Sequence, residues 1–294
     1  MKVSVLITAY KEPRTIAKAI DAFLNQKIDF EEIVVVCPDE ETTSVVYEYA
    51  SKYPFVKHVK DEQKGKPTAL NLGLKAIHSD VVVLSDGDVM VGEDAIDSMV
   101  DYFRDENVGA VTGRPISING RNTLLGYWSH LLTDAFHDMR SVRDKSNEFL
   151  LCSGYLFAFR TDLIKTVPED ALAEDAVISH MIAEMGYQIR YSSGSTVYVK
   201  YPTNYKDWLT QKIRSAGGYA QDYIRNSPLN MRSAKLEFLQ GAKRALSYPN
   251  NVHEFIWTLL LFAARLHLWF LVWLNVRFSK KSFSSIWKRV ESTK

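Results

Sequence analysis

Cysteine and net charge are both scarce in this sequence, and each shortage excludes a class of protein. Cys37 and Cys152 are the only 2 cysteines among 294 residues. They allow no disulfide framework and no cysteine-based zinc site, which is typical of a protein from a reducing compartment. The formal net charge is +1, so no global electrostatic field recruits nucleic acid or an acidic substrate.

A leader segment and internal repeats are also missing from the pattern. Met1 and Lys2 run directly into apolar residues 3–7, and no small-residue cleavage site follows them. We therefore expect no signal peptide and a cytosolic catalytic region. No repeat or low-complexity stretch is visible. The length suits one large α/β domain with an appendage.

Short apolar runs alternate with amphipathic segments through the first half of the chain. Strands are expected at residues 3–8, 33–36, 55–59 and 81–85, and the helices between them begin at Pro13, before Val45 and at Pro67. Proline suits the first turn of a helix, where its missing N–H costs nothing. Repeated strand–helix–strand order predicts a mostly parallel central sheet flanked by helices, with right-handed crossovers.

Beyond about residue 110 this alternation stops. Helices are expected at residues 124–139, 173–185 and 204–224, and strands at residues 149–160, 188–192 and 196–201. The helix at residue 173 opens on acidic residues, which suits the positive end of a helix dipole.

Two carboxylates follow the last strand of the first half, in the tripeptide Asp86-Gly87-Asp88. In open α/β sheets, ligands bind outside the carboxyl ends of the strands. Hard oxygen ligands suit Mg²⁺ or Mn²⁺, which are held by one or two carboxylates together with substrate phosphates. The pattern predicts a metal-assisted site for a nucleotide diphosphate. A solvent-exposed turn is the alternative.

A nearly continuous apolar stretch occupies residues 255–276. Its length could span a bilayer, but Arg265 lies near its centre and opposes insertion by about 2.5–3.5 kcal/mol. Lysine and arginine flank the stretch on both sides, which fits poorly with a single crossing. We expect a helix or short hairpin in the cytoplasmic interface of a membrane, with tryptophans at headgroup depth. The alternative is a helix buried against the globular domain or a dimer partner.

Four groups of motifs, in this order, resemble those of the family-2 glycosyltransferases, which have the GT-A fold. They are Ser4-Val5-Leu6-Ile7-Thr8-Ala9-Tyr10-Lys11-Glu12, then Gly65-Lys66-Pro67-Thr68-Ala69-Leu70-Asn71-Leu72-Gly73-Leu74 with Asp86-Gly87-Asp88, then Ser153-Gly154 with Ala173-Glu174-Asp175, and last Gln211-Lys212-Ile213-Arg214. The resemblance covers roughly residues 1–220. It implies a donor-binding half at residues 1–109 and an acceptor-binding half at 110–226. The apolar and basic residues that follow predict a membrane-associating segment at 227–294.

The resemblance further implies a nucleotide-diphospho-sugar donor and a divalent cation, Mn²⁺ or Mg²⁺. Asp88 is expected to ligate the metal directly, and Asp86 to contact the ribose or reach the metal through water. The other donor-binding residues that it implies are Thr8, Ala9, Tyr10, Glu12, Asp39, Lys66, Gly87 and Arg214. The metal would stabilise charge on the leaving nucleotide.

An acceptor hydroxyl needs a base to take its proton, and the resemblance assigns this role to Asp175. The acceptor-binding residues that it implies are Ser153, Gly154, Glu174 and Gln211. The interfacial C-terminus suggests a polyprenyl phosphate, a lipid-linked glycan or a glycolipid as acceptor. A phosphate acceptor is already ionised and needs no general base. Asp175 would then position or bind the acceptor.

The sequence departs from the family pattern at two places. The usual acidic pair after the second strand is replaced by Cys37-Pro38-Asp39. The sequence therefore does not predict which nucleobase the donor carries. The tryptophan that follows the arginine in processive members is replaced by Ser215, which favours transfer of a single sugar. Trp208 is expected in the core, and His180 is expected to pack and not to bind a ligand.

Two other functions compete with this prediction. A sugar-nucleotide nucleotidyltransferase would carry a glycine-rich basic loop after the first strand, and residues 8–12 contain none. A non-catalytic scaffold on a membrane surface would have no need of the four site carboxylates. We therefore predict an inverting, metal-dependent glycosyltransferase at the cytoplasmic face of a membrane. Its expected partners are the donor, a lipid-linked or glycan acceptor and the membrane surface, with no nucleic acid and with a homodimer left open.

Overall fold

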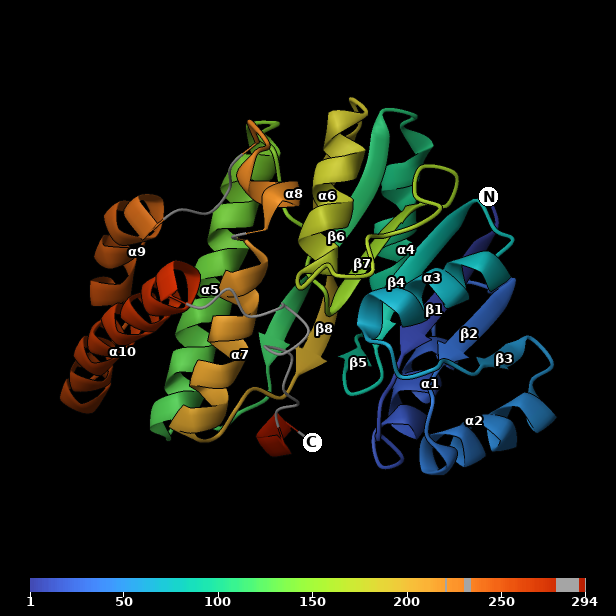
Figure 1. Cartoon of the computed structure of the whole chain (residues 1–294), viewed down its shortest axis with the longest axis horizontal. Coiled ribbons are helices and arrows are strands. Elements are labelled where there is room, and N and C mark those ends of the chain that lie inside the picture. Colours follow the sequence, from blue (N-terminus) through green and yellow to red (C-terminus); the bar gives the residue numbers. More distant parts are fainter. Residues whose placement is uncertain (220, 230–233, 279–290, 294) are drawn as a thin grey trace.

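The computed structural model describes residues 1–219, 221–229, 234–278 and 291–293. Within these residues an eight-stranded sheet has the order β3-β2-β1-β4-β7-β6-β8-β5 (Figure 1). The strands are β1 (Val3–Thr8), β2 (Glu32–Val36), β3 (Val56–Val59), β4 (Val81–Asp86), β5 (Met90–Val91), β6 (Val108–Ser117), β7 (Leu156–Arg160) and β8 (Gln188–Val199). The helices are α1 (Ile16–Leu24), α2 (Glu40–Lys52), α3 (Lys66–Ala76), α4 (Ala95–Val100), α5 (Leu124–Lys145), α6 (Glu174–Glu184), α7 (Tyr205–Gly218), α8 (Asp222–Arg225), α9 (Ala234–Ser247) and α10 (Val252–Phe278).

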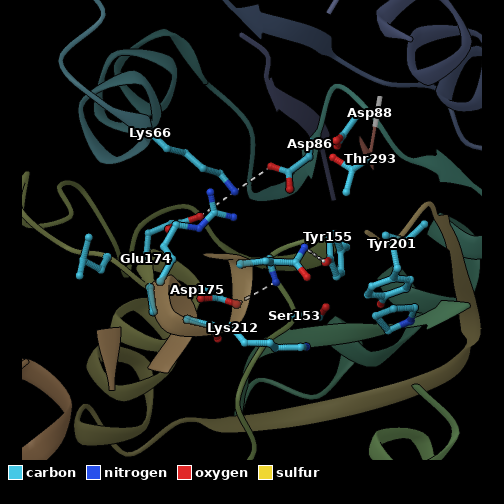
Figure 2. Close-up of a pocket in the computed structure, with 18 of the residues that line it drawn as sticks. Lys66, Asp86, Asp88, Ser153, Tyr155, Glu174, Asp175, Tyr201, Lys212 and Thr293 are labelled. Atoms are coloured by element: carbon cyan, nitrogen blue, oxygen red, sulfur yellow. Dashed lines mark hydrogen bonds and ion pairs between the residues drawn. The ribbon is translucent and has the colours of Figure 1, made fainter. Parts of the chain in front are cut away.

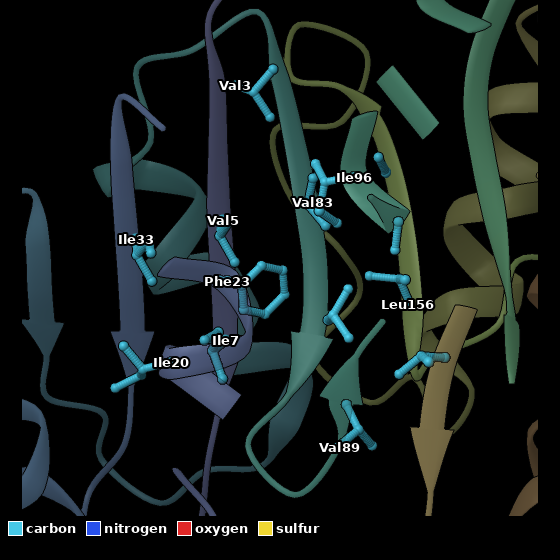
Figure 3. Packing of buried hydrophobic residues seen from close by; sticks show 14 of the residues in the cluster. Val3, Val5, Ile7, Ile20, Phe23, Ile33, Val83, Val89, Ile96 and Leu156 are labelled. Carbon is cyan, nitrogen blue, oxygen red and sulfur yellow. The ribbon is translucent and has the colours of Figure 1, made fainter. Parts of the chain in front are cut away.

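The first half of the sheet is parallel, as the sequence predicts. β1 pairs with β2 and β4, and β2 pairs with β3. Alternate side chains of a strand point to opposite faces, so Val5 and Ile7 join one core cluster and Leu6 joins the other. Figure 3 shows the first cluster, in which Phe23 of α1 lies against the strands. The register sets Thr8 beside Asp86, and both residues end their strands at the same edge.

The second half of the sheet is mixed. β7 runs antiparallel between β4 and β6, β6 and β8 are parallel, and β5 is antiparallel to β8. The sequence reading expected neither β5 nor β6. β6 is buried along its first six residues and pairs with β8 over most of its length. The predicted parallel order therefore holds for the first half of the sheet, and the second half is mixed.

The strand expected at residues 149–160 is wrong in its first part, because β7 starts only at Leu156, the eighth residue of that range. The backbone N–H groups before it bond to side chains and not to a neighbouring strand. Ser153 N donates to Thr112 Oγ1 at 2.9 Å, and Gly154 N donates to Asp175 Oδ2 at 2.9 Å. The segment is therefore a loop between α5 and β7 that forms hydrogen bonds with β6 and α6.

The two strands expected at residues 188–192 and 196–201 form one strand, β8. The predicted break survives as an irregularity in its pairing with β6. Thr112 faces Tyr191 while Arg114 faces Thr196, so β8 carries extra residues at this point. A bulge of this kind bends a strand without ending it.

The helix expected at residues 204–224 is divided into α7 and α8. Asn204 caps α7, since its side chain accepts a hydrogen bond from Asp207 N at 2.9 Å. Gly218 ends the helix where it passes close to the start of α6. A Cβ atom at Gly218 would lie 2.5 Å from the Cβ of Ala173, so a larger residue there would force the two helices apart.

The apolar helix α10 packs one face against α5 and α7, at the end of the molecule opposite β3 and α2 (Figure 1). Three polar contacts fix it on α5 and on the loop before α5. Arg121 binds both carboxylate oxygens of Glu254 at 2.9 and 3.0 Å. Trp128 Nε1 donates to the Trp257 carbonyl at 2.7 Å, and the hydroxyls of Tyr127 and Thr258 lie 2.7 Å apart. The shared core consists of Leu125, Tyr127, Trp128, Leu131, Trp208, Ala245, Leu261, Ala264 and Leu268.

The opposite face of α10 is exposed and apolar. We call it the outer face, and it consists of Phe255, Ile256, Leu259, Leu260, Leu266, Phe270 and Trp273. Residues Val252–Leu274 are long and apolar enough to cross a membrane. One face of this helix is therefore buried in the protein, and the membrane association predicted for the stretch stays a prediction. The predicted domain boundary at residue 226 stays a prediction.

Candidate active site

A pocket of about 860 Å³ opens where the donor and acceptor halves meet. The sequence-predicted site residues that line it are Thr8, Ala9, Tyr10, Glu12, Lys66, Asp86, Asp88, Ser153, Gly154, Glu174, Asp175, Gln211 and Arg214. They come from the ends of β1 and β4, from the start of α3, from the loop before β7, and from α6 and α7. The edge where the parallel strands end is the ligand-binding edge of an open α/β sheet.

Lys66 connects the two halves of the pocket. Its ammonium lies 2.7 Å from Asp86 Oδ1 and 2.6 Å from Glu174 Oε1 (Figure 2). Burial disfavours a charged lysine, but the two carboxylates outweigh that cost and raise the pKa of Lys66 above its usual value. The side chain is 23% exposed and is charged at neutral pH. It is therefore a fixed positive charge beside the predicted donor site.

Asp175 lies at the start of α6, and its carboxylate is held by backbone N–H groups. Oδ2 accepts from Gly154 N and Oδ1 accepts from Ala176 N, each at 2.9 Å. Gly154 is the residue that allows this approach, because a Cβ atom there would lie 3.2 Å from Asp175 Oδ2. These two backbone donors fix the orientation of the carboxylate. The carboxylate is oriented toward the pocket between Ser153 and Lys212 (Figure 2).

Asp86 and Asp88 both line the pocket, and Gly87 lies between them without lining it. A Cβ atom at Gly87 would come within 2.4 Å of Glu12 Oε2 and 2.8 Å of the Ala9 Cβ. Glycine therefore allows the turn after β4 to lie against the turn after β1. The donor contact predicted for Gly87 stays a prediction.

The carboxylate pair fits a metal that the substrate completes. Over the described ranges, no group of three or more His, Cys, Asp or Glu side chains forms a ready cage. Mg²⁺ keeps several non-protein ligands and is commonly held by one or two carboxylates with substrate phosphates. Asp86 and Asp88 supply that number of carboxylates, and the pocket leaves room for a diphosphate beside them.

Asp39 does not line the pocket. Its carboxylate caps α2 by accepting from Thr42 N at 3.0 Å, and it also accepts from Lys11 N at 2.7 Å. Burial disfavours its charge, but these hydrogen bonds outweigh burial and lower the pKa of Asp39. The contact to the base or ribose predicted for Asp39 stays a prediction. Its observed partners hold the turn after β1 against α2.

Several residues that line the pocket were not predicted from the sequence. Asp61 follows β3 and lines the same edge as Thr8, and burial raises the pKa of its carboxyl group. An acidic residue two positions after a predicted strand was the available signal. Tyr155 lies beside the predicted metal pair, and burial followed by the negative charges of Asp88 and Asp86 raises the pKa of its hydroxyl.

Two C-terminal segments also reach the pocket. Thr293, from the short 3-10 turn Glu291–Thr293, lines the same pocket as Asp88 (Figure 2). The turn is attached near the start of α7, since Ser292 N donates to Asp207 Oδ2 at 3.1 Å. From α10 the pocket is lined by Arg265, Leu268, Trp269 and Val272. No local motif predicts these contacts, because they depend on where distant segments pack.

Trp208 and His180 have the roles expected from the sequence. Trp208 is 4% exposed in the core that α5, α7 and α10 share. His180 is 2% exposed, and its ring centroid lies 4.9 Å from that of Phe149. Desolvation lowers the pKa of this buried imidazole.

Comparison with known proteins decides the family. The family model described as "Glycosyltransferase like family 2" matches residues 1–218. The chain belongs to glycosyltransferase family 2. Family membership supports a glycosyltransferase over the nucleotidyltransferase and scaffold alternatives.

Two curated relatives share the family-2 domain. The probable glycosyltransferase YdaM of Bacillus subtilis (strain 168) is 32% identical over 230 residues, which are 74% of this chain and 55% of that protein. The poly-beta-1,6-N-acetyl-D-glucosamine synthase of Staphylococcus epidermidis is 23% identical over 241 residues, which are 80% of this chain and 58% of that protein. The chain thus spans little more than half the length of these relatives.

A solved structure shares the fold. The mannosyltransferase PcManGT from Pyrobaculum calidifontis, in complex with GDP-Man and Mn²⁺, aligns with a TM-score of 0.64 and 21% sequence identity. The alignment covers 97% of this chain and 83% of that one. This likeness confirms the predicted GT-A-like fold, although the sheet is mixed where a mostly parallel one was predicted.

Proposed function

We propose that this family-2 enzyme is an inverting, metal-dependent glycosyltransferase that moves one sugar from a nucleotide-diphospho-sugar to a membrane-linked acceptor. The observation that carries the proposal is the assembly of one pocket from Asp86 and Asp88 on one side and Asp175 on the other (Figure 2). A sugar held between them has its leaving diphosphate on the first side and its attacking acceptor on the second. That arrangement suits a single in-line displacement.

In this reaction, an acceptor oxygen forms a bond to the anomeric carbon as the bond to the diphosphate breaks. The hydroxyl proton passes to the Asp175 carboxylate, and the nucleoside diphosphate leaves. Lys66 and Arg214 supply positive charge for the leaving diphosphate, and Asp88 with Asp86 would hold a divalent cation. When bound, that cation neutralises charge on the diphosphate and orients it. Attack opposite the leaving group inverts the anomeric configuration.

Donor binding is tested by thermal stability of the full chain against nucleotide diphosphates and nucleotide sugars, with and without Mn²⁺. A ligand at about 100 times its Kd adds about 2.7 kcal/mol to the stability of the folded state. We expect a metal-dependent shift for one nucleobase, lost in Asp88→Asn and retained in the matched surface variant Asp101→Asn. The absence of a shift for every nucleotide would refute the donor site.

Inversion and single transfer are tested on the product. We expect the anomer opposite to that of the donor, identified by NMR, and one added sugar per acceptor by mass spectrometry. Ser215 stands where processive members have tryptophan, and this supports single transfer. Retained configuration would refute the mechanism, and a ladder of longer products would refute single transfer. The Staphylococcus relative is named as a polymer synthase, so a ladder of longer products is the outcome to look for.

Membrane association is supported by the outer face of α10. Contiguous exposed apolar surface marks an interaction site, and basic residues flank this helix on both sides in the sequence, as suits an anionic cytoplasmic leaflet. We expect sedimentation with vesicles that contain anionic lipid, lost in the double variant Leu259→Asp with Leu266→Asp. If the wild-type protein dimerises in solution and does not sediment with vesicles, a second copy of the chain covers this face.

A further inference from the structure

One lysine contacts a carboxylate from each half of the pocket. The ammonium of Lys66 lies 2.7 Å from Asp86 Oδ1 and 2.6 Å from Glu174 Oε1 (Figure 2). Asp86 ends β4 in the donor half, whereas Glu174 is the first residue of α6 in the acceptor half. The two carboxylates therefore share one positive charge, and a change at either of them alters how strongly Lys66 binds the other.

The helix that carries Lys66 does not favour a cation at this position. Gly65, with a φ of +110°, turns the chain into α3 and makes Lys66 the first residue of that helix. A positive charge in the first turn opposes the helix dipole, and the partial burial of the side chain adds a cost of desolvation. The two carboxylates therefore hold the lysine in the pocket against the preference of its own helix.

Asp86 has a second cationic partner in the proposed reaction, because Asp86 and Asp88 are the proposed metal pair. The ammonium and a divalent cation on the same carboxylate repel each other, since like charges interact strongly at short range. Lys66 therefore weakens the pair as a site for a bare metal ion. A diphosphate removes this conflict, because its oxygens complete the coordination of the metal and accept charge-assisted hydrogen bonds from the lysine.

We propose that Lys66 and the divalent cation compete for Asp86, and that the diphosphate of the nucleotide ends this competition by binding both cations. Asp86 then turns from the lysine to the metal, while Glu174 keeps its contact with Lys66 and retains it in the pocket. This inference rests on the proposed function. It adds that metal and nucleotide favour each other's binding through one lysine, and such coupling is equal in both directions.

Binding of Mn²⁺ alone to the full chain, measured by EPR of the free ion up to millimolar Mn²⁺, tests the competition. We expect Lys66→Met to bind Mn²⁺ at least about tenfold more tightly than wild type, because a like charge beside the ligand carboxylate is removed. Lys66→Arg keeps that charge and should bind as weakly as wild type. The matched control Lys64→Met, at an exposed lysine paired with Glu62, should also bind as wild type.

Tighter binding is a result that damage to the fold does not produce. The gain should disappear when Asp88→Asn is added to Lys66→Met, because the metal then loses its other carboxylate. A wild-type affinity for Mn²⁺ in Lys66→Met would overturn the inference. A gain that survives Asp88→Asn would overturn it too, by showing that the ion binds elsewhere.

Glu174→Gln tests whether the carboxylate of the acceptor half acts through the lysine. With one partner fewer, Lys66 should bind Asp86 more strongly, so Mn²⁺ binding should weaken in the otherwise wild-type chain. In the Lys66→Met background the same change should have little effect, as a double-mutant cycle would show. Glu184→Gln, at an exposed acid at the other end of α6, is the control. An equal loss in both backgrounds would refute the shared lysine.

Nucleotide binding on the same samples separates this inference from the proposed function. The diphosphates of uridine, guanosine, adenosine, cytidine and thymidine are titrated by calorimetry with and without Mn²⁺. Mn²⁺ should tighten nucleotide binding at least about tenfold more in wild type than in Lys66→Met. Equal tightening in both proteins would leave the donor site standing and refute the competition. If wild type binds none of these nucleotides with Mn²⁺ present, the proposed function itself is refuted.

Discussion

The donor and acceptor walls of the pocket are built in different ways. The donor wall consists of short turns after β1 and β4, which are neighbours in a regular parallel sheet. The acceptor wall combines the loop before β7 with α5, α6, α7 and α10, which are separated in sequence by long intervals. The donor wall is acidic, whereas the acceptor wall supplies most of the cations.

This difference has a physical reason. The proposed donor diphosphate and metal would bring high charge of both signs, so a few fixed carboxylates on rigid strand ends would suffice. An acceptor must be recognised by shape and charge over a larger area, which separate helices can supply. The comparison predicts that donor-side changes abolish turnover generally, while acceptor-side changes depend on which acceptor is offered.

Asp175 is where we expect the largest effect and the sharpest dependence on acceptor. Replacement by Asn in Asp175→Asn removes the base, which is worth about 10²–10⁴-fold in rate for a hydroxyl acceptor. A phosphate acceptor is already ionised, so its kcat should fall far less. Steady-state kcat with each acceptor type is the measurement, and Asp162→Asn, an exposed acid after β7, is the control. Equal losses with both acceptors would show that Asp175 only positions the substrate.

Lys66 tests whether the donor wall depends on one fixed cation. Lys66→Met removes a charge held 2.7 Å from Asp86 and 2.6 Å from Glu174. Hydrogen bonds to charged groups contribute about 1.5–3 kcal/mol each, so the donor KM should rise about ten- to a hundredfold. Lys64→Met, at an exposed lysine paired with Glu62, should behave as wild type. A changed acceptor KM with an unchanged donor KM would place Lys66 in the acceptor wall.

Arg121 tests whether the acceptor wall depends on docking of α10. Arg121→Met leaves Glu254, whose side chain is 8% exposed, without its bidentate partner. We expect a loss of about 1–3 kcal/mol in the free energy of unfolding, measured by urea denaturation, and a raised acceptor KM. Nucleotide affinity should stay unchanged. Arg104→Met, at an exposed ion pair with Asp101, is the control, and a loss of nucleotide binding would contradict independent walls.

His180 gives the smallest effect, on the pH dependence of stability. Burial lowers the pKa of its imidazole below the ordinary 6.5, so the unfolded chain takes up the proton first as pH falls. Stability is therefore intact above about pH 6.5 and declines below it, by at most about 1.36 kcal/mol per pH unit. Thermal denaturation from pH 7 downward should show a shallower decline in His180→Phe. If the decline of stability with falling pH is unchanged in His180→Phe, other titrating groups, such as His137, cause that decline.

The sequence alone determined the donor wall. A parallel strand must be apolar on both faces and must end in a turn, so the positions of Thr8, Asp86 and Asp88 at one edge followed from local patterns. The pairing of Thr8 with Asp86 is the expected consequence. The motif at Lys66 was likewise local, because a helix starts there and its first turn faces the same edge.

Only the tertiary structure decided the acceptor wall and the role of α10. The turns at Ser153 and Gly154 exist because their N–H groups find Thr112 and Asp175, which are distant in sequence. Arg265 looked like a charge placed badly in an apolar stretch, and the packing of α10 on α5 and α7 turned it toward the pocket. Hydropathy counts residues along one chain segment, whereas the direction in which a helix face points depends on what packs against it.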